Sequence, residues 1–293
     1  MQRRIATLVV LVVCLGATCL FAGQFNYPEA KVVDVVDTLH GVAVHDPYRW
    51  LEDTDDPAVQ KWTDEENALT RSILDAIPQR EEVKARLADL WSYTQTSTPA
   101  RYGDRYFFER KKGLQDHAII YYQDGLDAEP VVALDPNKFE DHTAAVNFWI
   151  PSPKGEYLAY GVSTAGTEVA VISVLDLATM QDLPIKIPRA RYSSIVWDQD
   201  AGGFFYTRLP DLGSVPEGDE NYFRRIYYHK LGTDIAADPL IWRDDQNKEY
   251  SPGLSRSEDF NYLFMMIWYS TNEENSLYYM DLNNRDAGFK PMV

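Results

Sequence analysis

The sequence predicts a mainly β protein that contains part of a β-propeller, with a helical segment before it. Strand-like runs of aromatic and aliphatic residues recur along the chain, and the first run of each repeat begins at Tyr106, Tyr157, Phe204 and Tyr262. A second run of each repeat begins at Ile119, Val171, Ile226 and Leu277. Both series advance by about fifty residues, a period typical of four-stranded propeller blades. We therefore expect about four blades.

The composition supports a β-rich fold with a sizeable core and argues against nucleic acid as a partner. Aromatic residues are abundant, with 19 Tyr, 12 Phe and 7 Trp among 293 residues, and such residues favour strands. The formal net charge is −17, and basic residues occur only in short runs such as 110–112. Because so acidic a chain repels a phosphate backbone, we expect no nucleic-acid partner.

Residues 1–23 have the layout of a secretory signal peptide. Arg3 and Arg4 precede an apolar run from 5 to 20, and small residues follow it. We expect an exported protein, periplasmic or extracellular, with no stable membrane association after cleavage; an uncleaved membrane anchor is the alternative. Both cysteines, Cys14 and Cys19, lie in this segment. The mature chain would therefore have neither disulfides nor thiolate zinc sites.

Residues 24–91 are predicted to be helical in their second half. Asp56 can cap a helix, and Pro57 suits its first position. Apolar residues then recur on one helical face, at Val59, Trp62, Leu69, Ile73 and Ile77. Pro78 interrupts the pattern before it resumes, which indicates two consecutive helices. Residues 92–293 carry the blades, with turns expected at 152–155 and 198–202.

The sequence shows no constellation that would carry catalysis. The five histidines are isolated and do not form a His-Glu-x-x-His zinc motif, so we expect no metal. A nucleophilic serine would stand in Gly-x-Ser-x-Gly, but the strings around Ser163 and Ser255 lack that glycine spacing. Both also lie within the β-repeats, where a blade turn is the simpler interpretation. We expect no catalytic residue in this chain.

The string HDPYRWLED, from His45 to Asp53, closely resembles the start of prolyl oligopeptidases, together with Trp62 and Asn67. A second similarity runs from Thr207 to Asp234. The resemblance implies a seven-bladed propeller attached to an α/β-hydrolase domain built from both ends of the chain. It also implies cofactor-free, serine-type cleavage of short peptides after proline by a Ser-Asp-His triad.

By this resemblance, residues 24–91 correspond to the N-terminal helical part of the hydrolase domain and residues 92–293 to about four of seven blades. The triad has no counterpart here, so the chain is expected to be inactive alone. Short proline-containing peptides would be partners of the intact enzyme. The alternative is a self-standing secreted β-propeller that binds a ligand without catalysis. The segment 265–269, if left at an open edge, would promote aggregation.

Two groups of residues are candidates for specific roles. We expect a polar brace that ties the N-terminal segment to the hydrolase domain, formed by His40, Asp46, Arg49, Trp50 and Glu52. The resemblance implies two aromatic residues of the substrate pocket, Tyr192 and Tyr250.

Overall fold

The structure is a computed structural model and describes residues 25–292. The chain divides into two compact units, one ending at Asp89 and the other beginning at Leu90. Each unit is described by itself. The predicted signal peptide lies outside the described residues.

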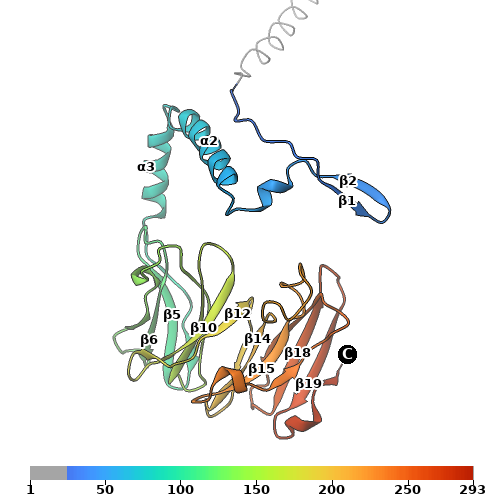
Figure 1. The fold of residues 1–293 in the computed structure, drawn as a ribbon. Coiled ribbons are helices and arrows are strands. Elements are labelled where there is room, and N and C mark those ends of the chain that lie inside the picture. The colour runs from blue at the N-terminus through green and yellow to red at the C-terminus, as the bar shows by residue number, and fades with distance from the viewer. Residues whose placement is uncertain (1–24, 293) are drawn as a thin grey trace, which may run out of the picture. The chain divides into compact units, whose positions relative to one another are not determined.

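The first unit contains a β-hairpin and most of two helices (Figure 1). Its elements are β1 (Val36–Leu39), β2 (Val42–His45), the 3-10 helix η1 (Arg49–Glu52), α2 (Pro57–Leu74) and α3 (Arg80–Trp91), which runs past the boundary. As predicted, Asp56 caps α2 by accepting from the Ala58 amide at 2.8 Å, and Pro57 is its first residue. Of the predicted apolar face of α2, only Val59 is buried. No residue of α3 is buried.

The second unit consists of four antiparallel sheets, which confirms the predicted four blades (Figure 1). Blade 1 contains β3 (Gln95–Thr96), β4 (Ala100–Tyr102), β5 (Arg105–Lys111), β6 (Ile119–Asp124) and β7 (Val131–Leu134). Blade 2 contains β8 (Ala145–Pro151), β9 (Tyr157–Ser163), β10 (Val169–Asp176), β11 (Gln181–Asp182) and β12 (Ile187–Arg191). Blade 3 contains β13 (Ile195–Trp197), β14 (Gly203–Arg208), β15 (Arg225–Lys230) and β16 (Leu240–Trp242). Blade 4 contains β17 (Tyr250–Arg256), β18 (Tyr262–Tyr269), β19 (Asn275–Asp281) and β20 (Lys290–Pro291).

Alternating residues of the strands hold neighbouring blades together. Phe204 of β14 lies in the core shared with blade 2, whereas the next residue, Phe205, lies in the core shared with Leu263 of blade 4. Both phenylalanines are almost fully buried. Successive side chains of a strand point to opposite faces of the sheet, so one aromatic pair serves two interfaces. This explains why the repeats are rich in consecutive aromatic residues.

One face of blade 4 is less covered than the other. Leu263, Met265 and Ile267 of β18 are buried, and Leu263 packs in the core shared with blade 3. The residues that alternate with them point to the opposite face, and of these Tyr262 and Trp268 are 39% and 45% exposed. Blade 4 therefore presents an apolar face that no other element of the second unit covers.

The blades have two different ends. At one end the strands are joined by tight turns, as predicted for 152–155 and 198–202: Gly155 donates to the Ser152 carbonyl at 2.8 Å and Ala201 to the Asp198 carbonyl at 3.1 Å. The connections at the opposite end, which we call the loop end, include 164–168, 192–194, 209–224 and 270–274, and 209–224 is the longest of these four.

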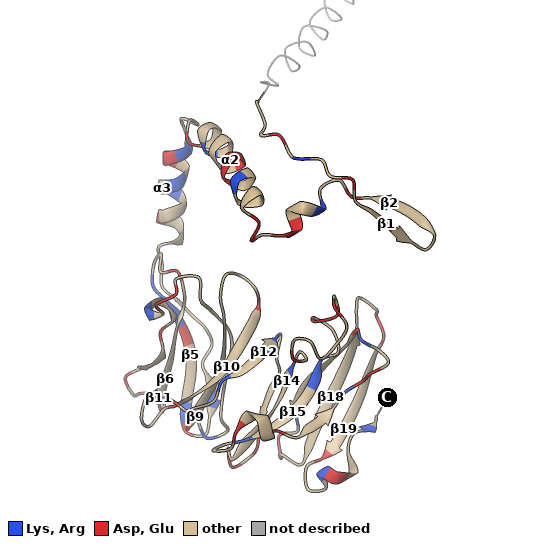
Figure 2. Cartoon of the chain, in the orientation of Figure 1, with Lys and Arg blue, Asp and Glu red and all other residues tan. Residues whose placement is uncertain are grey.

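Lys, Arg, Asp and Glu residues are distributed along the backbone of both units (Figure 2). Neither α2 nor α3, the α-helices of the described residues, combines the length and apolarity that crossing a membrane requires.

Candidate functional site

Tyr192 directly follows β12 at the loop end and is 64% exposed. Its hydroxyl donates to the Glu168 carboxylate, and the Arg191 guanidinium lies over its ring at 5.1 Å from the centroid. Arg191 also pairs with Glu168 at 2.9 Å. The Tyr192 hydrogen bond, followed by that of Arg191, lowers the pKa of Glu168. The ion pair between Arg191 and Glu168 therefore holds the exposed Tyr192 ring in place at the surface.

The backbone at the loop end adopts a conformation that side chains usually avoid. Left-handed φ values between 46° and 60° occur in these connections at five residues other than glycine: Ala165, Glu168, Tyr192, Phe223 and Ser270. Arg189, within β12, has a left-handed φ of 65°. Such residues cost energy and persist only where the surroundings enforce them, which is common at functional sites. This clustering singles out the loop end of blades 2 to 4 as the candidate site.

Arg224 holds the backbone that carries Tyr192. It directly precedes β15, is only 8% exposed, and donates from Nη1 to the Arg191 and Tyr192 carbonyls at 2.5 and 2.7 Å. Burial, followed by repulsion from Arg191, lowers the pKa of Arg224 to about 10. The guanidinium therefore remains charged at neutral pH, and it fixes the position of the Tyr192 loop.

A cavity of about 210 Å³ lies beside Arg224 at the loop end. Its walls include Tyr222, Arg224, Lys248, Glu249, Tyr250 and Ser270. Tyr250 is half-buried and contacts Tyr269 edge to face, with ring centroids 5.7 Å apart. Lys248 lies 4.8 Å from the Tyr222 ring centroid and pairs with Asp219 at 2.6 Å. The structure thus connects the two predicted pocket residues, Tyr192 and Tyr250, through Arg224.

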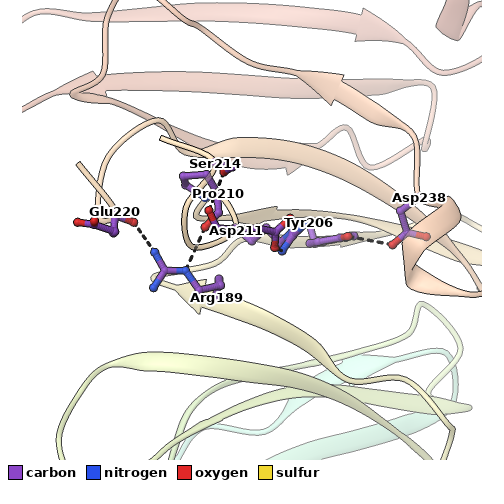
Figure 3. Close-up of polar contacts among 8 residues, drawn as sticks. Arg189, Tyr206, Pro210, Asp211, Ser214, Glu220 and Asp238 are labelled. Atoms are coloured by element: carbon purple, nitrogen blue, oxygen red, sulfur yellow. Dashed lines mark hydrogen bonds and ion pairs between the residues drawn. The ribbon is translucent and has the colours of Figure 1, made fainter. Parts of the chain in front are cut away.

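Two further arginines hold the connection 209–224, which forms part of this end. Arg189 donates to the Pro210 carbonyl at 3.1 Å and also to the Glu220 carbonyl (Figure 3). Arg208 binds both carboxylate oxygens of Asp211, at 2.6 and 3.1 Å. The two points at which Arg189 holds this loop are ten residues apart in sequence, so a single side chain constrains most of its length.

The residues predicted to form the brace lie in the first unit. Arg49 pairs with Asp46 at 2.6 Å, with Glu52 at 3.5 Å, and with Asp37, which was not predicted. The Arg49 hydrogen bond is the main cause that lowers the pKa of Asp46. His40 lies apart from this group, exposed in the β1–β2 turn with a left-handed φ of 51°.

Trp50 joins the same region by other contacts. Its indole Nε1 donates to the Lys31 carbonyl at 2.6 Å, and its ring meets Trp62 edge to face at 6.4 Å. Trp50 is half-buried within this unit, and Tyr48 is 47% exposed. Among residues 25–292, no three potential metal-ligating side chains gather in one place.

A row of antiparallel blades of four or five strands each, with a polar and aromatic pocket among the loops at one end, defines this chain as a partial β-propeller. The chain belongs to the prolyl oligopeptidase family, since the family model described as "Prolyl oligopeptidase, N-terminal beta-propeller domain" matches residues 27–293.

Known proteins similar to this chain are longer than it is. A prolyl endopeptidase of Elizabethkingia meningoseptica is 35% identical over 274 residues, which make up 92% of this chain and 38% of the relative. Prolyl oligopeptidase A of Amanita bisporigera is 29% identical, with 89% and 38% covered. A solved structure from a study of two prolyl endopeptidases has a TM-score of 0.83 and 32% identity, covering 92% of this chain and 39% of that one. The chain therefore spans under two fifths of these relatives.

Proposed function

We propose that this chain is the N-terminal part of an exported serine-type endopeptidase that cleaves short peptides after proline. The observation that carries the proposal is the match of residues 27–293 to the family's propeller, together with 35% identity to a prolyl endopeptidase of which the chain spans 38%. In this proposal the reaction needs no metal or organic cofactor.

The two units would have different roles in such an enzyme. The first unit would complete an α/β-hydrolase domain, with the Arg49 cluster as its internal brace. The exposure of apolar residues on α3 supports this role, since Val83 and Leu87 are each about half exposed. The second unit would form part of a propeller that limits access to short peptides. The uncovered face of blade 4 supports the packing of a further blade at that position.

The loop end would contribute contacts to the peptide. Tyr192 is exposed there on a strained backbone, and Tyr250 lines the neighbouring cavity. Aromatic side chains of this kind bind the apolar ring of proline and other apolar groups without a large entropic cost. The chemical step would depend on a Ser-Asp-His triad that no motif of this sequence supplies, so we expect the 293-residue chain to be inactive alone.

The proposal is tested by assaying the complete product of the gene beside the 293-residue chain. The substrates are a fluorogenic peptide that releases its fluorophore after proline and the same peptide with alanine in place of proline. We expect the complete product to cleave the proline peptide preferentially and to react with a serine-directed fluorophosphonate, and the 293-residue chain to do neither. A complete product that binds the peptide without cleaving it would favour a propeller binding module instead.

Export is tested separately. N-terminal sequencing of the protein secreted from its native cells should begin after the apolar run of residues 5–20. An intact Met1 on membrane-bound material would favour the uncleaved anchor.

A further inference from the structure

We propose that Arg224 presents a pre-organised fork that binds a carboxylate of the peptide in the loop-end cavity. This inference rests on the proposed function and adds to it a preference for peptides that bear an acidic side chain or a free C-terminal carboxylate at this place.

The first support is that only one of the three guanidinium nitrogens of Arg224 has hydrogen-bond partners among the described residues. Nη1 is committed to the Arg191 and Tyr192 carbonyls. Nε and Nη2 have no hydrogen-bond partner among residues 25–292, and together they form the edge of a guanidinium that binds the two oxygens of a carboxylate in parallel.

The second support is that this free edge is open. The Nε atoms of Arg191, Arg208 and Arg225 are enclosed without a partner, whereas neither free nitrogen of Arg224 is enclosed in that way. Arg224 also forms part of the wall of the 210 Å³ cavity. Its remaining donors are therefore accessible although the residue as a whole is only 8% exposed.

The third support is that no carboxylate of the described residues compensates the positive charge of Arg224. Two other partly buried arginines of the blades each have a carboxylate partner: Arg191 pairs with Glu168, and Arg285 pairs with Asp198. No described carboxylate lies within ion-pair distance of Arg224. Lys248 in the same wall is already paired with Asp219, and Glu249 is exposed and makes no ion pair with Arg224. A buried, uncompensated cation strongly favours an anionic ligand.

The cavity is also suited to the rest of such a ligand. Its volume matches one side chain, and the rings of Tyr222 and Tyr250 line it. An aliphatic stem of a Glu side chain would lie between these rings while the carboxylate reaches Arg224. Because Nη1 already fixes the guanidinium, little side-chain entropy is lost on binding.

The test uses nuclear magnetic resonance of the Arg Nε–Hε groups in the full 293-residue chain. The probes are acetyl-Glu-Pro-Gly-amide, the Gln counterpart, and the Gln counterpart with a free C-terminus. We expect the Arg224 signal, assigned by its loss in Arg224→Lys, to shift with a carboxylate-bearing probe. We expect that probe to bind at least about tenfold more tightly than the neutral one, as charge-assisted bidentate contacts imply. The probe that shifts the signal identifies which carboxylate is bound.

Arg224→Lys keeps the charge but removes the fork, so it should abolish most of the preference. The matched control Arg256→Lys changes a half-buried arginine outside this cavity and should leave the preference unchanged. A folding defect in Arg224→Lys would weaken the binding of all three probes equally and would show in the melting curve. In that case the ratio of the wild-type affinities for the acidic and neutral probes decides. Equal affinity of wild type for the acidic and neutral probes would overturn the inference. Prolyl cleavage by the complete product does not depend on that result, so the two proposals fail separately.

Discussion

The Tyr206 hydroxyl donates to the Asp238 carboxylate at 2.9 Å and thereby ties β14 to the residue that ends the 3-10 helix Ile235–Ala237 (Figure 3). The other Asp238 oxygen lies 2.8 Å from Nδ1 of His229, which is fully buried. Burial, followed by the nearby Asp238, raises the pKa of Tyr206 above its ordinary value. The hydroxyl therefore remains a donor over the whole physiological range.

Asp238→Ala should lower the free energy of unfolding by about 3 kcal/mol, because it leaves a buried hydroxyl and a buried imidazole without their shared acceptor. Urea denaturation measures the change. Asp234→Ala is the matched control: this residue caps the same 3-10 helix by accepting from the Ala236 amide, and its loss should cost about 1 kcal/mol. Equal losses for both variants would mean that the buried network contributes no more than a cap.

Gly203→Ala should destabilise blade 3 by about 2 kcal/mol or more. A Cβ at this position would lie 2.5 Å from the His229 carbonyl oxygen, and the backbone of a paired strand does not move aside cheaply. At the adjacent Gly202 the nearest atom to a Cβ would be an Asp200 oxygen at 3.2 Å, on an exposed side chain that needs to move by only a few tenths of an ångström. Thermal melts of the two variants should therefore differ clearly. A Gly202→Ala melt as low as that of Gly203→Ala would contradict the packing described for this turn.

Tyr192→Phe should raise the pKa of Glu168, because the Tyr192 hydroxyl is the main cause that holds it below 4.5. A depressed carboxyl pKa means that the contact stabilises the folded chain above about pH 4.5 and is lost as the pH falls through the folded-state pKa. Carbon-detected titration of the Glu168 carboxyl measures this directly. Tyr222→Phe serves as the control and should leave the pKa unchanged. If Tyr192→Phe also leaves it unchanged, the hydroxyl does not bind Glu168 in solution.

The 293-residue chain alone should self-associate and bind a hydrophobic dye through the uncovered face of blade 4. Trp268→Lys should reduce both, because it places a charge on that face. Leu126→Lys is the control, since Leu126 is 67% exposed but lies outside blade 4. Analytical ultracentrifugation gives the result. A wild-type chain that stays monomeric and binds no dye would mean that this face is not available for a further blade.

The repeats in the sequence predicted the blades, because side chains alternate between the two faces of each strand and this alternation can be seen within a few consecutive residues. The two helices were predicted for the same reason, from Asp56, Pro57 and Pro78. The role of Arg224 could not be predicted, because the pair Arg224 and Arg225 resembles an ordinary exposed basic pair in sequence. Its burial arises only when the loop after β12 folds against the start of β15. His40 was grouped with Arg49 by proximity in sequence, whereas the hairpin turn carries it away.

The central claim is that this chain is the front part of a larger prolyl peptidase, and the coding sequence beyond the codon for Val293 tests it most directly. We predict that the reading frame continues through further strand repeats of about fifty residues and then encodes Gly-x-Ser-x-Gly followed by an Asp and a His. A stop codon directly after Val293 in the native gene would contradict the claim and leave a propeller without a nucleophile.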